Sequence, residues 1–178
     1  MTIVERKTRE TRIRLQLERG SGAAKVATGI PFLDHMMVIL ARYSSLDMQL
    51  EAAGDLKHHI TEDVAIAVGR AIAELAPANA ARYGDQTIPM DDALVQACID
   101  VGGRPYYQGP LPSAMYDHWM RSFADNAKAT LHIRVIRGTD RHHIVEAAFK
   151  ALGMTLRAAL VEKDSVFSTK GAVTFEGR

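Results

Sequence analysis

Residues 58–62 read His-His-Ile-Thr-Glu, and residues 142–146 read His-His-Ile-Val-Glu, an offset of 84 positions (142 minus 58) in a chain of 178 residues. A glycine follows each glutamate after seven positions, at Gly69 and Gly153. Chance rarely repeats such features in one order at matching spacing, and a repeat at a fixed offset is the signature of an internal duplication. The sequence therefore predicts that two copies of one structural unit make up the fold.

A second motif precedes each of these His-His-x-x-Glu triplets. Asp34-His35-Met36-Met37 lies ahead of the first, and Asp117-His118-Trp119-Met120 lies ahead of the second. The histidine of the first motif stands 23 positions before His58, and that of the second stands 24 positions before His142. Each copy thus contains one histidine in an Asp-His element and two in a triplet. Only His132 among the seven histidines falls outside the pattern, and we expect it to serve packing.

Hydrophobic periodicity indicates the same order of elements in both halves. Residues 11–18 alternate apolar and polar side chains, as a half-buried strand does. Gly20-Ser21-Gly22 indicates a turn, and we interpret Lys25–Thr28 as the return strand of a hairpin. The first half further predicts a helix over 32–43, a strand over 46–50 and a helix over 59–76; the second half predicts strands over 92–101 and 104–108, a helix over 115–127, a strand over 130–137 and a helix over 143–162.

Each half therefore consists of strand, strand, helix, strand and helix. Such a unit predicts an α+β domain in which helices cover one face of each sheet. We expect a single domain over residues 1–178, made of repeats at about 1–84 and 85–165 and a short C-terminal tail.

Composition is that of an ordinary globular protein, with 47% hydrophobic and 24% charged residues. A net charge of +1 gives no reason to expect nucleic acid or a membrane surface as a partner, and no apolar run reaches the roughly 18 residues that span a bilayer. The first residues lack the apolar core of a signal peptide. A single cysteine, Cys98, excludes an internal disulfide and a thiolate metal cluster. We therefore expect a cytoplasmic protein that binds metal through nitrogen and oxygen atoms.

Helix geometry predicts how each triplet can bind metal. Residues three or four apart share one face of a helix, whereas adjacent residues diverge by about 100°. Glu62 can therefore join His58 or His59 at one ion, but the two histidines are poorly placed to bind the same ion. Each triplet is expected to serve two different metal sites.

The candidate ligands divide evenly into two sites of three histidines and one glutamate. On a six-coordinate ion this leaves two open positions for water or substrate, as in a catalytic site. Nitrogen and oxygen ligation permits Mn²⁺, Fe²⁺, Co²⁺, Ni²⁺ and Zn²⁺. The eight candidate ligands are His35, His58, His59, Glu62, His118, His142, His143 and Glu146.

Three basic sequences could bind an anion. Ser168-Thr169-Lys170-Gly171 combines two hydroxyls, a cation and a flexible backbone, a composition that suits a phosphate. Arg82 precedes Tyr83-Gly84, and Arg104 follows Gly102-Gly103. Taken singly, each arginine is more simply explained as a solvated surface residue.

Together these motifs resemble the imidazoleglycerol-phosphate dehydratase family over nearly the whole chain. The double triplet with a terminal Ser-Thr-Lys-Gly is specific to that family. The matching stretches are Arg9-Glu10-Thr11, Phe32-Leu33-Asp34-His35-Met36, Gly54-Asp55-Leu56, His58-His59 with Glu62-Asp63, Pro89-Met90-Asp91, Gly103-Arg104-Pro105, Leu131-His132-Ile133, His142-His143 with Glu146, Phe149-Lys150-Ala151 and Ser168-Thr169-Lys170-Gly171.

The resemblance implies a duplicated α+β fold like the second domain of ribosomal protein S5. It implies a Mn²⁺-dependent hydro-lyase of histidine biosynthesis, with two ions per active site. This enzyme would convert D-erythro-imidazole glycerol phosphate to imidazole acetol phosphate and water. It also implies a homo-oligomer, a 24-subunit shell with active sites completed between subunits, and the same eight metal ligands.

Site residues carried over from the resemblance fall into two groups. Glu10, Glu62 and Glu146 are the expected catalytic residues. The expected substrate-binding residues are Glu10, Arg82, Arg104, Ser168, Thr169 and Lys170, of which the last five face the phosphate. Two alternatives stay open at this point: a metallohydrolase that uses paired ions to activate water, and a non-catalytic shell in which histidine clusters only bridge subunits.

Overall fold

The computed structural model describes residues 1–166, and the duplication is visible in its element order. Each half contains three strands, a helix, a strand and a second helix. The first half comprises β1 Thr2–Lys7, β2 Thr11–Arg19, β3 Ala24–Ala27, α1 Pro31–Ser44, β4 Leu46–Gly54 and α2 Lys57–Leu75. The second half comprises β5 Tyr83–Met90, β6 Ala93–Val101, β7 Tyr106–Gln108, α3 Ala114–Ala127, β8 Ala129–Arg137 and α4 Arg141–Ala159.

The two sheets have the same topology. Their strand orders are β1-β2-β4-β3 and β5-β6-β8-β7, and in each sheet the last pair is parallel while the other pairs are antiparallel. The α+β class is therefore confirmed, with one strand per unit more than expected. The additional strands, β1 and β5, form sheet edges and bury few side chains. Val4 is the one buried residue of β1, and β5 has no buried residue.

The predicted hairpin between residues 11–18 and Lys25–Thr28 is wrong. β3 pairs in parallel with β4, and β2 forms its hairpin with β1 instead. The turn after β2 is anchored by Asp47 at the start of β4, whose Oδ1 accepts hydrogen bonds from the backbone N–H groups of Ser21, Gly22 and Ala23 at 2.8–2.9 Å. This anchor directs the chain across to the far edge of β4.

Asp47 also yields a test of stability against pH. The backbone hydrogen bond from Ala23, with those from Ser21 and Gly22, holds the pKa of Asp47 below its ordinary value of 3.8. A carboxylate with a lowered pKa contributes stability above its unfolded pKa and loses that contribution as the pH falls. We expect Asp47→Ala to lower the unfolding temperature at pH 7. The difference from the wild type should shrink as the pH falls below 3.8, and a constant difference in thermal melts from pH 7 to 3 would contradict this account.

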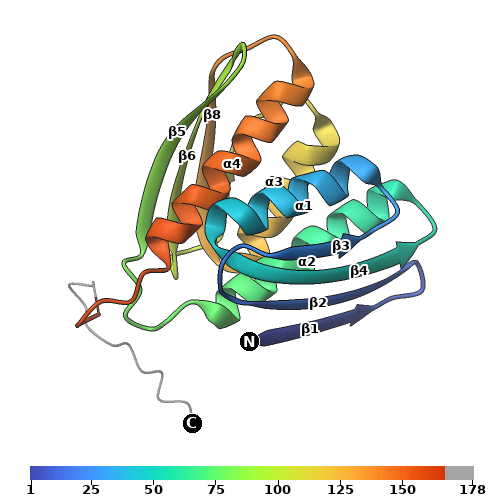
Figure 1. Ribbon diagram of the computed structural model, residues 1–178, viewed down its shortest axis with the longest axis horizontal. Helices are drawn as coiled ribbons and strands as arrows, with labels where there is room; N and C mark the ends of the chain where they lie inside the picture. The colour runs from blue at the N-terminus through green and yellow to red at the C-terminus, as the bar shows by residue number, and fades with distance from the viewer. Residues whose placement is uncertain (167–178) are drawn as a thin grey trace.

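The four helices lie between the two sheets, as Figure 1 shows. α1 and α2 pack on the first sheet, and α3 and α4 pack on the second. The helices then pair across the two copies, α1 with α4 and α2 with α3. Within residues 1–166 no helix is long and apolar enough to cross a membrane.

The glycines that follow the triplets explain how closely these helices approach. A Cβ built on Gly69 of α2 would lie 2.5 Å from the carbonyl oxygen of Phe123 in α3. A Cβ on Gly153 of α4 would lie 2.7 Å from Cβ of Tyr43 in α1. Since real side chains do not tolerate such contacts, both helix pairs need glycine here.

The centre of the helical layer is aromatic. Trp119 is fully buried, stacks on Phe123 at 5.4 Å between ring centroids and lies 4.7 Å from the ring of Phe149. Trp119 belongs to α3 and Phe149 to α4, so this cluster joins the two helices of the second copy beside the cross-copy pairs.

Candidate metal centre

All four helices begin at one end of the molecule. The ring of Phe32 in α1 contacts Tyr116 of α3 at 5.1 Å and His142 of α4 at 5.0 Å. His58 of α2 stacks on His118 of α3, with ring centroids 5.3 Å apart and planes 14° apart. Since the Asp-His elements and the triplets both lie at helix starts, six histidines gather at this end.

One histidine–carboxylate group forms where α1 meets α4. Oε2 of Glu146 lies 3.2 Å from Nε2 of His35 and 3.1 Å from Nε2 of His142. Glu146 is only 6% exposed, whereas both imidazoles reach solvent. We call these three residues the α1–α4 group; their candidate ligand atoms all lie within 4.8 Å of one another.

A second group forms where α2 meets α3. Oε2 of Glu62 lies 3.8 Å from Nε2 of His58, and Oε1 lies 3.4 Å from Nε2 of His118. These atoms also fall within 4.8 Å of one another, and we call this the α2–α3 group.

Each group combines residues from both copies. The Asp-His element of the first copy supplies His35 to the triplet of the second copy, and His118 of the second copy joins the triplet of the first. This exchange follows directly from the cross-copy pairing of the helices. The sequence alone had not shown which histidine meets which triplet.

The aspartate of each Asp-His element holds the start of its helix. Asp34 accepts hydrogen bonds from the backbone N–H and the hydroxyl of Thr28, at 2.8 and 2.6 Å. Asp117 accepts from the hydroxyl of Tyr107 at 2.7 Å and from the backbone N–H of Leu111 at 2.9 Å. In each copy this carboxylate ties the preceding loop to the turn that carries the histidine.

The second histidine of each triplet diverges from the first, as helix geometry predicts. Nδ1 of His59 lies 2.8 Å from Oδ1 of Asp55, and Nδ1 of His143 lies 2.8 Å from Oδ1 of Asp92. These hydrogen bonds raise the pKa of both imidazoles above the ordinary value. Such a bond fixes a proton on Nδ1 and places the lone pair on Nε2, the nitrogen that can bind an ion. In His143 this nitrogen lies 3.5 Å from Oδ2 of Asp91. Neither histidine belongs to its own chain's α1–α4 or α2–α3 group.

The two carboxylates that bond His59 and His143 differ in their other hydrogen bonds. Asp92 also accepts hydrogen bonds from the backbone N–H groups of Thr139 and Asp140, at 2.6 and 3.0 Å. These contacts hold the pKa of Asp92 well below its ordinary value. Asp55 has a simpler environment, and its pKa is lowered mainly by the hydrogen bond from His59.

The two groups differ in the residue four positions after their glutamate. Nζ of Lys150 lies 2.9 Å from Oε1 of Glu146, whereas the corresponding position behind Glu62 is Ile66. Burial opposes ionisation of Glu146, but the hydrogen bonds from Lys150 and His35 outweigh it and lower the pKa of this carboxyl. The α1–α4 group therefore keeps a buried carboxylate charged beside a cation.

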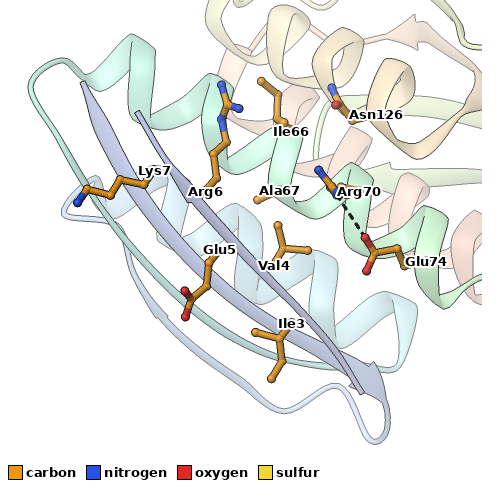
Figure 2. Close-up of a pocket in the computed structure, with 10 residues that line it drawn as sticks. All are labelled: Ile3, Val4, Glu5, Arg6, Lys7, Ile66, Ala67, Arg70, Glu74 and Asn126. Atoms are coloured by element: carbon orange, nitrogen blue, oxygen red, sulfur yellow. Dashed lines mark hydrogen bonds and ion pairs between the residues drawn. The ribbon is translucent and has the colours of Figure 1, made fainter. Parts of the chain in front are cut away.

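A groove of about 450 Å³ lies between α2 and β1, and Asn126 of α3 also lines it (Figure 2). Its wall includes Arg6, whose Nε is 2.9 Å from Oδ1 of Asp63 but poorly aligned for a hydrogen bond. Asp63 also accepts a hydrogen bond from the hydroxyl of Thr11. These contacts fix β1 and β2 against the helix turn that carries Glu62.

Arg82 and Arg104 lie away from the six histidines at the helix starts. The backbone N–H of Arg82 donates to the carbonyl of Ala159 at the end of α4, and its guanidinium pairs with Asp100 at 2.6 and 3.0 Å. A helix rises 1.5 Å per residue, so this point is about 25 Å along α4 from His142. The carbonyl of Arg104 accepts from Thr130 at the start of β8, near the end of α3 opposite to His118.

The remaining residues singled out from the sequence have three different outcomes. Glu10 lies on the turn before β2, with Oε2 3.7 Å from Nδ1 of His59. Ser168, Thr169 and Lys170 lie outside the described residues. His132 is exposed on β8 beside the ring of Tyr106, a packing position as expected.

Sequence reasoning missed the roles of Asp55, Asp92 and Lys150. Asp55 stands four residues before His59, and Lys150 four residues after Glu146, so helical spacing could have indicated both contacts. Asp92 lies 51 residues before His143, and no local pattern connects them.

Comparison with known proteins gives one consistent family. Residues 28–156 match the family model for imidazoleglycerol-phosphate dehydratase. The imidazoleglycerol-phosphate dehydratase of Pyrobaculum calidifontis is 45% identical over 94% of this chain and 97% of its own length. That of Corynebacterium urealyticum is 40% identical over 95% of this chain and 94% of its own length.

Solved structures agree with this assignment. The crystal structure of the Pyrococcus furiosus enzyme, 37% identical, superposes with a TM-score of 0.87 over 96% of this chain and all of that one. The Staphylococcus aureus enzyme, 31% identical, gives 0.79 over 92% of this chain and all of that one. Relatives of this identity and coverage show the family as well as the fold. The chain belongs to the imidazoleglycerol-phosphate dehydratase family of hydro-lyases.

Proposed function

We propose that this protein dehydrates D-erythro-imidazole glycerol phosphate to imidazole acetol phosphate and water in histidine biosynthesis. The observation that carries the proposal is the pair of histidine–carboxylate groups gathered at one end of the helical layer. The relatives' names supply the substrate, and Cys98, a free thiol, is compatible with the cytoplasmic location that we propose.

The residues present fit two Mn²⁺ ions. Each group offers two imidazole nitrogens and a carboxylate oxygen within 4.8 Å, and such nitrogen and oxygen donors suit a divalent transition metal. His35, His142 and Glu146 would hold one ion, and His58, His118 and Glu62 the other. A bound Mn²⁺ would act as a Lewis acid that makes the substrate's imidazole N–H more acidic.

We propose that active sites are completed between subunits of a 24-subunit shell. Each group has two histidines from its own chain, one fewer than the three expected. His59 and His143 belong to neither group, and each bonds through Nδ1 to a carboxylate, so each can supply its Nε2 to a group on a neighbouring subunit. The distance of about 25 Å between Arg82 and His142 along α4 likewise requires a neighbour if both are to contact one small substrate.

The chain's own side chains would divide the work of dehydration. The reaction removes a hydroxyl as water and takes a proton from carbon, so it needs an acid/base group that can reach the substrate. The Glu10 side chain is 58% exposed and lies at the histidine end, which suits that role. Arg82 and Arg104, with Ser168, Thr169 and Lys170, would bind the phosphate and thereby position the reacting end.

The first test is turnover of imidazole glycerol phosphate by protein loaded with Mn²⁺, followed through the ketone product. We expect turnover by the wild type and a fall in kcat of about 10²–10⁴-fold in Glu10→Gln, with KM changed far less. Full turnover by this variant would remove Glu10 from the acid/base role. Activity on simple phosphate esters, with none on the imidazole substrate, would identify a metallohydrolase instead.

A further inference from the structure

The turn that carries Glu10 has a counterpart in the second copy. Glu10 ends the β1–β2 turn and directly precedes Thr11, the first buried residue of β2. Asp92 ends the β5–β6 turn and directly precedes Ala93, the first buried residue of β6. The two carboxylates therefore occupy corresponding places in the duplicated unit.

Each of these turn carboxylates faces the second histidine of its own triplet. Oδ1 of Asp92 lies 2.8 Å from Nδ1 of His143, within hydrogen-bond distance. Oε2 of Glu10 approaches the same nitrogen of His59, but stops at 3.7 Å. Within residues 1–166, this is the one ion-pair contact of the Glu10 carboxylate, which accepts no hydrogen bond there.

In the first copy another carboxylate makes the hydrogen bond. Asp55 stands four residues before His59 and lies 2.8 Å from its Nδ1. The position four residues before His143 is Thr139, which has no carboxylate and instead donates two hydrogen bonds to Asp92. The same ring orientation is thus produced by a carboxylate of the adjoining loop in one copy and by the turn carboxylate in the other.

We infer that Asp55 positions His59 and thereby keeps Glu10 free for acid/base work, whereas Asp92 is fully occupied in positioning His143. The exposures agree, since the side chain of Glu10 is 58% exposed and that of Asp92 is 38% exposed. The part that concerns Glu10 rests on the proposed function. The part that concerns ring orientation depends only on the metal sites.

The inference predicts different outcomes when the carboxylate that bonds each second histidine, Asp55 or Asp92, is removed. If Asp55 is replaced by alanine, Glu10 can close the 3.7 Å gap and take over the hydrogen bond from His59. Metal binding would then survive, but Glu10 would be withdrawn from chemistry. In the second copy, Asp91 lies against Nε2 of His143 at 3.5 Å, on the ligand side of the ring, and so cannot replace Asp92.

The experiment measures Mn²⁺ affinity of the assembled protein, from free Mn²⁺ by electron paramagnetic resonance, together with kcat. We expect Asp55→Ala to lower kcat at least tenfold and to change Mn²⁺ affinity less than about threefold. Glu10→Ala alone should also leave affinity within about threefold. The double variant Asp55→Ala/Glu10→Ala should lose about 10–100-fold in affinity at one class of site, the usual cost of removing a partner of a ligand histidine.

Two further variants separate positioning from a general effect on folding. Asp55→Asn keeps a carbonyl oxygen to accept the His59 proton, so its kcat should fall less than that of Asp55→Ala. Asp92→Asn keeps one oxygen for the loop but turns an amide toward His143, which favours the wrong tautomer. That change alone should cost about 10–100-fold in Mn²⁺ affinity. Thermal melts of the metal-free proteins check that each variant folds, and gel filtration with saturating Mn²⁺ checks that it assembles.

Three results would overturn the inference: wild-type kcat in Asp55→Ala, a tenfold loss of affinity in Asp55→Ala alone, or wild-type affinity in the double variant. A wild-type protein that binds Mn²⁺ but does not dehydrate imidazole glycerol phosphate would instead refute the proposed function. The affinity comparisons would still decide how the histidines are oriented.

Discussion

Glu146→Gln and Glu62→Gln are each expected to lose one Mn²⁺ per chain and to lower kcat/KM by at least about 10³-fold, or about 4 kcal/mol of transition-state stabilisation. Each glutamate is the only carboxylate in its group, and it links histidines from different copies. An amide keeps the shape of the side chain but removes the negative charge that a divalent ion requires. Metal content after gel filtration and turnover of imidazole glycerol phosphate provide the two measurements.

The two variants should differ in stability without metal. Glu146 is buried and pairs with Lys150, which is only 17% exposed, so its replacement leaves a cation poorly paired. We expect a loss of about 1–3 kcal/mol in the free energy of unfolding. Glu62 is partly exposed, and its replacement should cost less than about 1 kcal/mol. Glu74→Gln, on the exposed side of α2, is the matched control and should retain metal and activity. Equal melting temperatures for the first two variants would contradict the role of Lys150.

Gly69→Val is expected to prevent folding, and Gly69→Ala to lower the free energy of unfolding by about 1–3 kcal/mol. A Cβ at this position meets backbone atoms of α3, the Phe123 oxygen at 2.5 Å and the Ala127 nitrogen at 2.9 Å. These atoms cannot move without shifting the helix. The loss should therefore exceed the roughly 1 kcal/mol that alanine normally gains over glycine in a helix.

Denaturant unfolding measures this effect, and Arg70→Ala is the neighbouring control. Arg70 is exposed and pairs with Glu74 at 3.2 Å, a surface contact worth less than about 1 kcal/mol. The alanine variant should also lose activity, because a shift of α3 moves His118 away from Glu62. A Gly69→Ala protein as stable as the wild type would show that α2 and α3 can separate freely.

The central elements were predictable because their side chains alternate between core and solvent. β2 buries Ile13, Leu15 and Leu17 against exposed Arg12 and Arg14, and this pattern is visible in the sequence. The edge strands lack such a pattern. β1 turns the half-buried Arg6 inward toward Asp63, and β5 turns inward a glycine that fits against the backbone of α4. Hydrophobic periodicity does not detect strands of this kind.

The candidate ligands could be identified by composition and repetition, and their divergence by helix geometry. Their grouping could not, because it depends on which helices pair. His35 and Glu146 are 111 residues apart, and they meet only because α1 packs on α4. Asp92 was missed for a similar reason, since its contact with His143 depends on the position of a distant turn. Phosphate binding by Ser168, Thr169 and Lys170, which lie outside the described residues, stays a prediction.

The pairing of helices across the two copies has an evolutionary consequence. A single unit carries one Asp-His element and one triplet, but it brings them together only by facing a second unit. Two identical units related by a twofold axis would build two identical groups at once. Two copies within one chain are free of this constraint, so each group can change without changing the other. Lys150 in one half, where the other half has Ile66, records that independence.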